Sequence, residues 1–260
     1  MYRLRRYVLF TLAGLLAIVA ILNPTAIADG ESTDVHFTNG LVYYALGFTD
    51  MATRELKRVC DLAPSNIEAR MALGMAYQAK GDLDNALKTY QEILDLDNSL
   101  LYVHGLLGDV YRGKGEGEQA KSHYLKAKED EELVVVPTYG LGVLAEESGD
   151  IDLAVGYYRE VLEIGPDHVD TALRLADLLS HTGDVEGGLQ VLTEANRYNP
   201  REPELHYKWG LLHMQKANYS EALHEFDRVL QLEGGHRGAR QELRKLEALL
   251  KKEGANLPTN

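Results

Sequence analysis

The sequence predicts an all-α solenoid in which pairs of antiparallel helices stack one after another. Two observations predict it: a ladder of glycines with a strict period of 34 residues, and a second set of glycines seven residues further on. The ladder positions are Gly40, Gly74, Gly108, Gly142, Ala176 and Gly210. A fixed interval of this length, held through six copies without insertion, is typical of one supersecondary unit stacked on itself.

The second set of glycines predicts the turn inside each copy. It comprises Gly47, Gly81, Gly115, Gly149 and Gly183, with Ala217 in the last copy. The next position is polar in five copies, as Asp82, Glu116, Asp150, Asp184 and Asn218, and is Phe48 in the first copy. Glycine accepts the left-handed backbone that ends one helix, and a short polar side chain caps the next. We therefore expect a helix, a turn and a second helix in every copy.

The second helix of each copy carries a small residue and, one turn later, a large one. The small residues are Ala52, Ala86, Ala120, Ala154, Gly188 and Ala222. The large residues are Leu56, Tyr90, Tyr124, Tyr158, Leu192 and Phe226. A small residue lets two helix backbones approach closely, and the large side chain fills the groove beside that contact.

These residues resemble the tetratricopeptide repeat family, whose pattern places Leu-Gly and Tyr on a first helix and Ala and an aromatic residue on a second. The second copy matches it with Leu73, Gly74, Tyr77, Ala86 and Tyr90. The resemblance implies a right-handed α-solenoid, the tetratricopeptide superhelix. It divides the chain into repeats at residues 33–66, 67–100, 101–134, 135–168, 169–202 and 203–236.

After the sixth repeat, residues 237–252 predict a helix that caps the solenoid. Ala239, Leu243, Leu246 and Leu250 recur at helical spacing and would cover the last repeat, with basic residues around them. In an alternative interpretation the leucine stripe is a dimer contact. Residues 253–260 are expected to form a flexible tail.

The amino terminus has the pattern of an export signal. Arg3, Arg5 and Arg6 precede an apolar run over residues 7–22, and Ala26 and Ala28 fit a small-x-small cleavage site. The run is short for a membrane span, which needs about 20 residues. We expect residues 1–28 to be a signal peptide cleaved after Ala28 or, alternatively, an uncleaved membrane anchor. The repeats are then exported across the cytoplasmic membrane, to the periplasm, the cell surface or the medium.

Composition limits the function classes. The formal net charge is −13, which disfavours binding to nucleic acid, and the single Cys60 excludes a disulfide within the chain. Cys60 takes a position that is leucine in other copies, so we expect a small buried hydrophobe. Asn218 begins a glycosylation sequon, but its position favours helix capping.

No residue pattern indicates catalysis, a cofactor or a metal. His36, His104 and His206 share one repeat position. Packed helices lie about 8–10 Å apart, so equivalent residues of different repeats cannot converge on one ion. We expect no enzyme activity, no cofactor and no metal site.

The family resemblance implies a partner-binding groove formed by the first helices, at positions three before, one after and four after the ladder residue. The predicted groove residues are Phe37, Leu41, Tyr44, Met71, Met75, Asp109, Arg112, Tyr139, Val143, Glu146, Asp177, Tyr207, Leu211 and Met214. Apolar residues dominate both ends, and Asp109, Glu146 and Asp177 lie in the middle. We expect a protein or peptide partner with apolar anchors and a central basic residue.

The sequence thus predicts a non-enzymatic scaffold that holds an envelope or secreted protein in its groove, with a monomer favoured. Two alternatives remain open: a self-associating spacer or membrane tether, and an accessory subunit of an enzyme complex.

Overall fold

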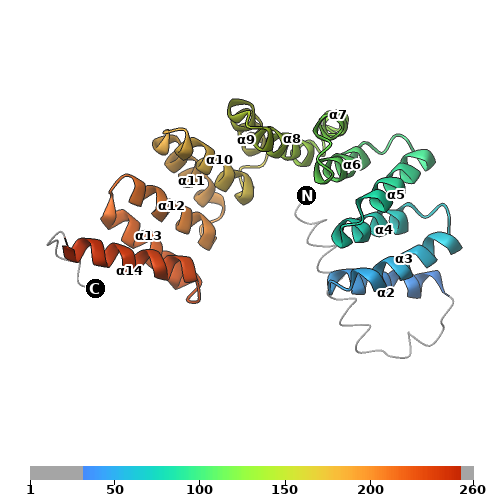
Figure 1. The fold of residues 1–260 in the computed structure, drawn as a ribbon, viewed down its shortest axis with the longest axis horizontal. Coiled ribbons are helices and arrows are strands. Elements are labelled where there is room, and N and C mark those ends of the chain that lie inside the picture. Colours follow the sequence, from blue (N-terminus) through green and yellow to red (C-terminus); the bar gives the residue numbers. More distant parts are fainter. Residues whose placement is uncertain (1–31, 253–260) are drawn as a thin grey trace. The chain divides into compact units, whose positions relative to one another are not determined.

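The computed structural model describes residues 32–252, and its secondary structure there consists of thirteen helices (Figure 1). The first seven are α2 (Thr33–Ala45), α3 (Thr49–Leu62), α4 (Ile67–Lys80), α5 (Leu83–Leu96), α6 (Leu101–Gly113), α7 (Gly117–Ala127) and α8 (Val135–Ser148). The others are α9 (Ile151–Ile164), α10 (Val169–His181), α11 (Val185–Tyr198), α12 (Pro203–Gln215), α13 (Tyr219–Leu232) and α14 (Arg237–Lys252). The predicted all-α architecture is confirmed. The predicted signal segment 1–28 and tail 253–260 lie outside the described residues.

The chain divides into two compact units, one ending at Gly140 and the other beginning at Leu141. The sequence predicted one continuous solenoid, whereas this boundary falls inside α8. The preceding helix α7 spans only 11 residues, and the acidic run Glu129–Glu132 follows it. Within each unit, consecutive helices pack as antiparallel pairs (Figure 1).

The ladder glycines receive the large side chain of the second helix. A methyl group added at Gly142 would lie 2.5 Å from the ring of Tyr158, and one at Gly210 would lie 2.6 Å from Phe226. Both aromatic side chains are fully buried. The predicted close packing of small and large residues is confirmed. The ring of the second helix, however, packs directly on the ladder glycine of the first helix, as well as beside the small residue one turn earlier on its own helix. An alanine at these positions would force the ring away.

The fifth repeat uses the same contact with different residues. Ala176 replaces the ladder glycine, and Leu192 replaces the aromatic ring that would collide with it. The small residue of α11 is here Gly188, and a methyl group added there would lie 3.0 Å from the carbonyl oxygen of Ala176. The departures from the repeat pattern therefore compensate one another.

The turns follow the prediction at the glycines. Gly47, Gly81, Gly115, Gly149 and Gly183 all have positive φ values, between 76° and 93°. Ala217 keeps this backbone, with φ of 57°. Left-handed backbone at these positions is what ends each first helix.

The capping prediction holds for three of the five polar residues. Asp82, Asp150 and Asp184 accept the amide hydrogen three residues ahead. Glu116 and Asn218 make no capping bond, so the prediction is wrong for them. The longer Glu116 side chain instead accepts from Nε2 of Gln119, at 3.2 Å.

Helix α14 closes the second unit, as predicted for a capping helix. Ala239, Leu246 and Leu250 are buried in one cluster with Phe226 and Val229 of α13. The leucine stripe that could have formed a dimer contact is thus covered within the chain.

Candidate functional site

In both units, tyrosines of second helices hold polar side chains of first helices. Tyr90 Oη donates to Gln78 Oε1 at 2.5 Å, and Tyr124 Oη donates to Asp109 Oδ1 at 2.6 Å. In the second unit, Tyr158 Oη donates to Glu146 Oε2 at 2.6 Å. These tyrosines are the same residues whose rings cover the ladder glycines. Each ring therefore packs the helix pair while its hydroxyl fixes one polar group.

Burial keeps the hydroxyls of Tyr90 and Tyr124 protonated. The pKa values of Tyr90 and Tyr124 are raised well above the usual range, chiefly because burial disfavours the phenolate. Burial also raises the pKa of Asp109, although the Tyr124 hydroxyl and Arg112 oppose that shift. Each of these two hydroxyls therefore keeps its proton and donates it to its acceptor, Gln78 for Tyr90 and Asp109 for Tyr124.

In the second unit, two carboxylates also pair with cations from the next repeat. Arg174 Nη1 lies 3.0 Å from Glu146 Oε2, and Lys208 Nζ lies 2.5 Å from Asp177 Oδ1. Glu146 thus accepts from both Tyr158 and Arg174. The result is a row of fixed polar groups of both signs on α8, α10 and α12.

Sequence reasoning missed Arg174 and Lys208. Both occupy the position two before the ladder residue, which the predicted groove set did not include. The available signal was that this position is charged only in the last two repeats, being Thr38, Ala72, Leu106 and Gly140 in the others. A carboxylate in the groove positions of the preceding repeat, Glu146 for Arg174 and Asp177 for Lys208, then identifies each pair.

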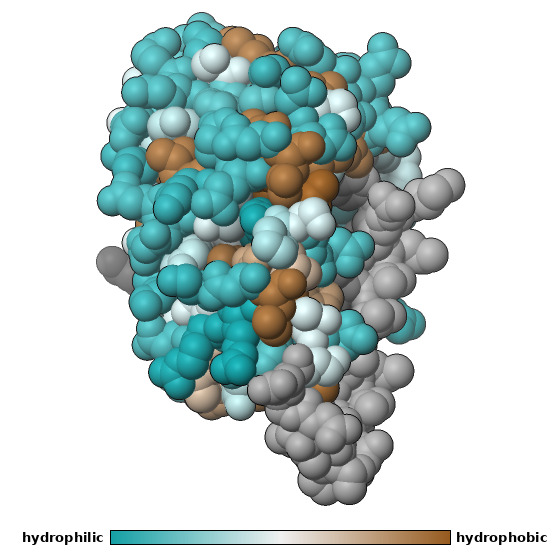
Figure 2. All heavy atoms as spheres, turned by 90° about the vertical axis from the view of Figure 1, so that its right-hand side faces the viewer, coloured by the Kyte–Doolittle hydropathy of each residue, from teal (hydrophilic) through white to brown (hydrophobic). Residues whose placement is uncertain are grey.

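The apolar members of the predicted groove are largely used for packing. Phe37, Leu41 and Tyr44 lie against a buried cluster that contains Leu56 and Leu73. Met71 lies against the core of the second and third repeats, while Met75 is 36% exposed. Tyr139 and Arg112 are half-buried. Figure 2 faces the side of α2 to α5 and shows apolar surface as separate areas between hydrophilic ones.

Two predicted groove positions of the second unit offer less surface than expected. Val143 is 6% exposed and belongs to the interior. Tyr207 packs against the cluster formed by α13 and α14, and its ring centre lies 4.8 Å from that of His236, directly before α14, and 6.0 Å from that of Phe226 on α13.

Leu211 and Met214 also pack against the cluster formed by α13 and α14. The capping helix takes the place that a seventh first helix would occupy, so it covers these side chains.

The buried histidines pair with residues of the second helix in their own repeat. His36 Nδ1 lies 2.6 Å from Glu55 Oε2, and His206 Nδ1 lies 2.7 Å from Glu225 Oε2. In the third repeat a histidine replaces the glutamate, and His104 Nδ1 lies 2.9 Å from His123 Nδ1. Across residues 32–252, no three His, Cys, Asp or Glu side chains are grouped as a metal site would require.

Cys60, which the sequence predicted as a small buried hydrophobe, is half-buried and packs against the cluster that contains Leu56 and Leu73. Burial raises the pKa of its thiol, against the opposing influence of Arg70. A protonated thiol is a weak nucleophile, which disfavours a reactive role.

Within the described part of the chain, no helix combines the length and apolar character that crossing a bilayer requires. The apolar run at residues 7–22 lies outside that part of the chain.

Comparisons with known proteins give the family. Models described as tetratricopeptide repeat match residues 37–100, 105–169 and 145–208. The chain belongs to the tetratricopeptide repeat family. The residues that carried the resemblance in the first five repeats lie within these matched segments, whereas those of the sixth repeat, from Gly210 to Phe226, lie beyond them.

Solved tetratricopeptide repeat (TPR) structures share the fold. PilF of Pseudomonas aeruginosa is 19% identical with a TM-score of 0.63, and the match covers 82% of this chain and 97% of PilF. PilW, a widely conserved type IV pilus biogenesis factor, is 13% identical with a TM-score of 0.66, over 81% of this chain and 98% of PilW. YrrB, a TPR protein with an unusual peptide-binding site, is 19% identical with a TM-score of 0.52, over 73% and 97%. At these identities the likeness establishes the fold alone.

A curated relative matches a short part of this TPR chain. The probable biofilm formation methyltransferase WspC of Pseudomonas putida is 36% identical over 59 residues. The match spans 23% of this chain and only 14% of WspC. It therefore says nothing about a methyltransferase activity here.

Proposed function

We propose that this TPR protein is a non-enzymatic interaction scaffold that binds an extended segment of an envelope or secreted protein along its first helices. The observation that carries the proposal is the row of polar side chains on α8, α10 and α12 of the second unit, which Tyr158, Arg174 and Lys208 hold in place. Membership of a family of interaction modules supports it, as does the absence of any catalytic pattern in the sequence.

The fixed geometry matters for affinity. Binding costs free energy when side chains must be ordered, and groups already held in place avoid that cost. Tyr158 and Arg174 hold the Glu146 carboxylate, and Lys208 holds that of Asp177. These pairs present both acceptors and donors, which an extended peptide backbone can match with its own N–H and C=O groups.

The internal pairs change what the sequence predicted about the partner. A central Lys or Arg of the partner would have to displace Arg174 or Lys208 from its carboxylate. In the second unit we therefore propose recognition of peptide backbone and polar side chains rather than of one basic residue.

The solved relatives support a role in assembly. PilW is a pilus biogenesis factor, and YrrB has a peptide-binding site. We propose that the present chain likewise serves the assembly of an envelope structure, on the outer side of the membrane to which its N-terminal segment directs or anchors it. The covered leucine stripe of α14 favours this function over a self-associating spacer.

The test is affinity capture with the full chain and with the double variant Arg174→Ala/Lys208→Ala. Proteins retained from a native extract are identified, and their affinity for both chains is then measured. Loss of two charge-assisted hydrogen bonds should weaken binding of the true partner by at least about tenfold.

The matched control is Arg54→Ala/Arg58→Ala, which removes two exposed arginines from the second helix α3. It should bind as the unmodified chain does. Circular dichroism should give equal helical content for all three. Unchanged capture by Arg174→Ala/Lys208→Ala would exclude the row of polar side chains on the first helices α8, α10 and α12, the first-helix row, as the binding surface.

A further inference from the structure

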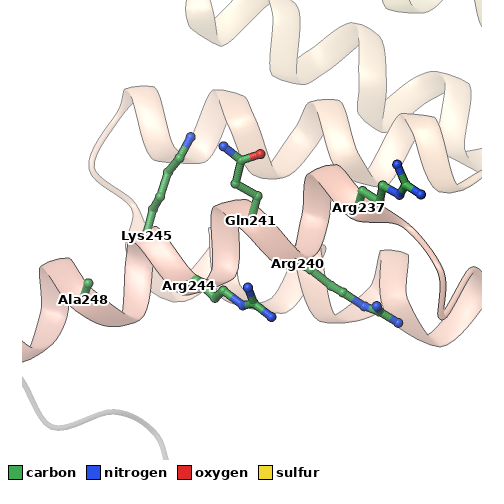
Figure 3. Close-up of a pocket in the computed structure, with 6 residues that line it drawn as sticks. All are labelled: Arg237, Arg240, Gln241, Arg244, Lys245 and Ala248. Atoms are coloured by element: carbon green, nitrogen blue, oxygen red, sulfur yellow. The ribbon is translucent and has the colours of Figure 1, made fainter.

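Helix α14 presents a basic face that the proposed function does not use. Arg237, Arg240, Arg244 and Lys245, with Gln241 and Ala248, line an open depression of about 700 Å³. All six residues are exposed. In Figure 3, Arg240 and Arg244 point to one side of the helix, and Gln241 and Lys245 point to the other. Cationic side chains therefore extend from both sides of α14.

Few of these charges are neutralised within the chain. Lys245 Nζ pairs with Glu242 Oε1 at 2.7 Å, and Arg240 donates to the carbonyl oxygen of Gly234. The side chains of Arg237 and Arg244 make no hydrogen bond or ion pair with any residue between 32 and 250. Their guanidinium groups keep all their donors for a ligand from outside.

The charge of α14 opposes that of the chain. The helix contains six basic and two acidic residues, a formal charge of +4, whereas the whole chain carries −13. An anionic ligand is therefore attracted to this helix and repelled by the remaining surface. Such a contrast directs an acidic partner to one place.

We propose that this basic face, formed by Arg237, Arg240, Arg244 and Lys245, docks an Asp- and Glu-rich segment of a protein partner. Arginine forks pair bidentately with carboxylates, and three arginines lie along successive turns of the helix. The surface is separate from the first-helix row, and it does not depend on that row's function.

A membrane surface is a less suitable ligand. Amphipathic helices bind lipid by inserting an apolar face between headgroups. In α14 that face is buried, because Ala239 and Leu246 are fully covered by α13. The acidic remainder of the chain would also be repelled by anionic lipid and by nucleic acid.

The experiment measures binding of a fluorescein-labelled oligo-glutamate peptide to the full chain by fluorescence anisotropy. The variant Arg240→Glu/Arg244→Glu should bind the peptide at least about tenfold more weakly, because attraction is replaced by repulsion. Added salt should weaken binding to the unmodified chain. The matched control Arg54→Glu/Arg58→Glu makes the same charge change on α3 and should bind within about twofold of the unmodified chain.

Several outcomes would overturn the proposal. One is equal loss of peptide binding in both charge-reversal variants, and another is no binding by the unmodified chain at physiological salt. Tighter binding to phosphatidylserine vesicles than to the peptide would assign the face to a membrane. Light scattering that detects a dimer lost only in Arg240→Glu/Arg244→Glu would assign it to a second copy of the chain.

The variant Arg174→Ala/Lys208→Ala should retain peptide binding, so failure of the first-helix proposal leaves this result unaffected.

Discussion

Single residues in this chain are often interpretable by comparison with their equivalents in other repeats. Ala217 is one such residue, because the other five repeats have glycine at that position. Its φ of 57° brings the Cβ atom close to the following carbonyl oxygen, which costs about 1–2 kcal/mol for an L-residue. The turn of the sixth repeat therefore stores strain that the other turns avoid.

The variant Ala217→Gly should increase the free energy of unfolding by about 0.5–1 kcal/mol, since relief of strain exceeds the greater flexibility of glycine in the unfolded chain. Denaturant unfolding measures the change. The control Ala248→Gly, at an exposed position inside α14, should lower stability by about 1 kcal/mol because glycine is a poor helix former. A loss of stability in Ala217→Gly would contradict the strain argument.

At the scale of the helix pair, two positions connect each first helix to its second. At the first, the ladder glycine of the first helix receives a large side chain of the second helix. At the second, the residue four positions before the ladder residue contacts a residue of the second helix nineteen positions later in the sequence, as His36 contacts Glu55. This second contact is a His–Glu pair in the first and sixth repeats and the pair His104–His123 in the third. A carboxylate stabilises a charged imidazole, whereas a second imidazole does not.

The His104–His123 pair should make the first unit sensitive to acid. Burial lowers the pKa of His104 to about 4 and also lowers that of His123, with Lys126 adding to both shifts. The unfolded state therefore takes up protons first as pH falls, and the free energy of unfolding should decline between about pH 6.5 and 4. Above about pH 7.5 these residues are neutral in both states, and stability should be constant with respect to them.

The variant His123→Glu recreates the pair found in the first and sixth repeats. The charged imidazole then gains a carboxylate partner, so the loss of stability between pH 6.5 and 5 should be smaller by about 1–2 kcal/mol. Urea unfolding at several pH values measures it. Parallel pH profiles for the two chains would show that the histidine pair does not control the acid response.

At the scale of the whole molecule, each helix pair depends on its neighbours and the last pair depends on α14. Equivalent ion pairs join consecutive repeats, such as Lys80 with Asp50 at 2.7 Å, and Lys114 with Asp84. These pairs are solvent-exposed and contribute little to stability. Stability therefore comes mainly from the apolar contacts between adjacent helices, which act over short distances.

The variant Leu246→Ala should remove about 2–4 kcal/mol of packing between α14 and α13. Hydrogen exchange should then speed up in α12, α13 and α14, while amides of α4 to α6 keep their protection, because each repeat contacts only its neighbours. The control Leu125→Ala truncates an exposed leucine on α7 and should change little. Faster exchange in α4 to α6 of Leu246→Ala would indicate cooperation over the whole chain.

The sequence by itself determined the helices, the turns and the repeat period of this TPR protein. The first helices begin at Thr33, Ile67, Leu101, Val135, Val169 and Pro203, with the same step of 34 residues as the ladder. These features follow from local preferences: glycine accepts positive φ, and small residues permit close helix contact. The periodic pattern repeats each signal, which is why few of these predictions failed.

Only the tertiary structure decided which side chains are available to a partner. Val143 is buried and Tyr207 lies beside α14, while Arg174 and Lys208 join carboxylates of the preceding repeat. The failed caps at Glu116 and Asn218 and the division of the chain within α8 were equally unpredictable. The 34-residue period determines which environment a position shares across the repeats: core, turn or first-helix surface. Contacts between repeats depend on the length and charge of the side chains that meet there, and those differ from copy to copy.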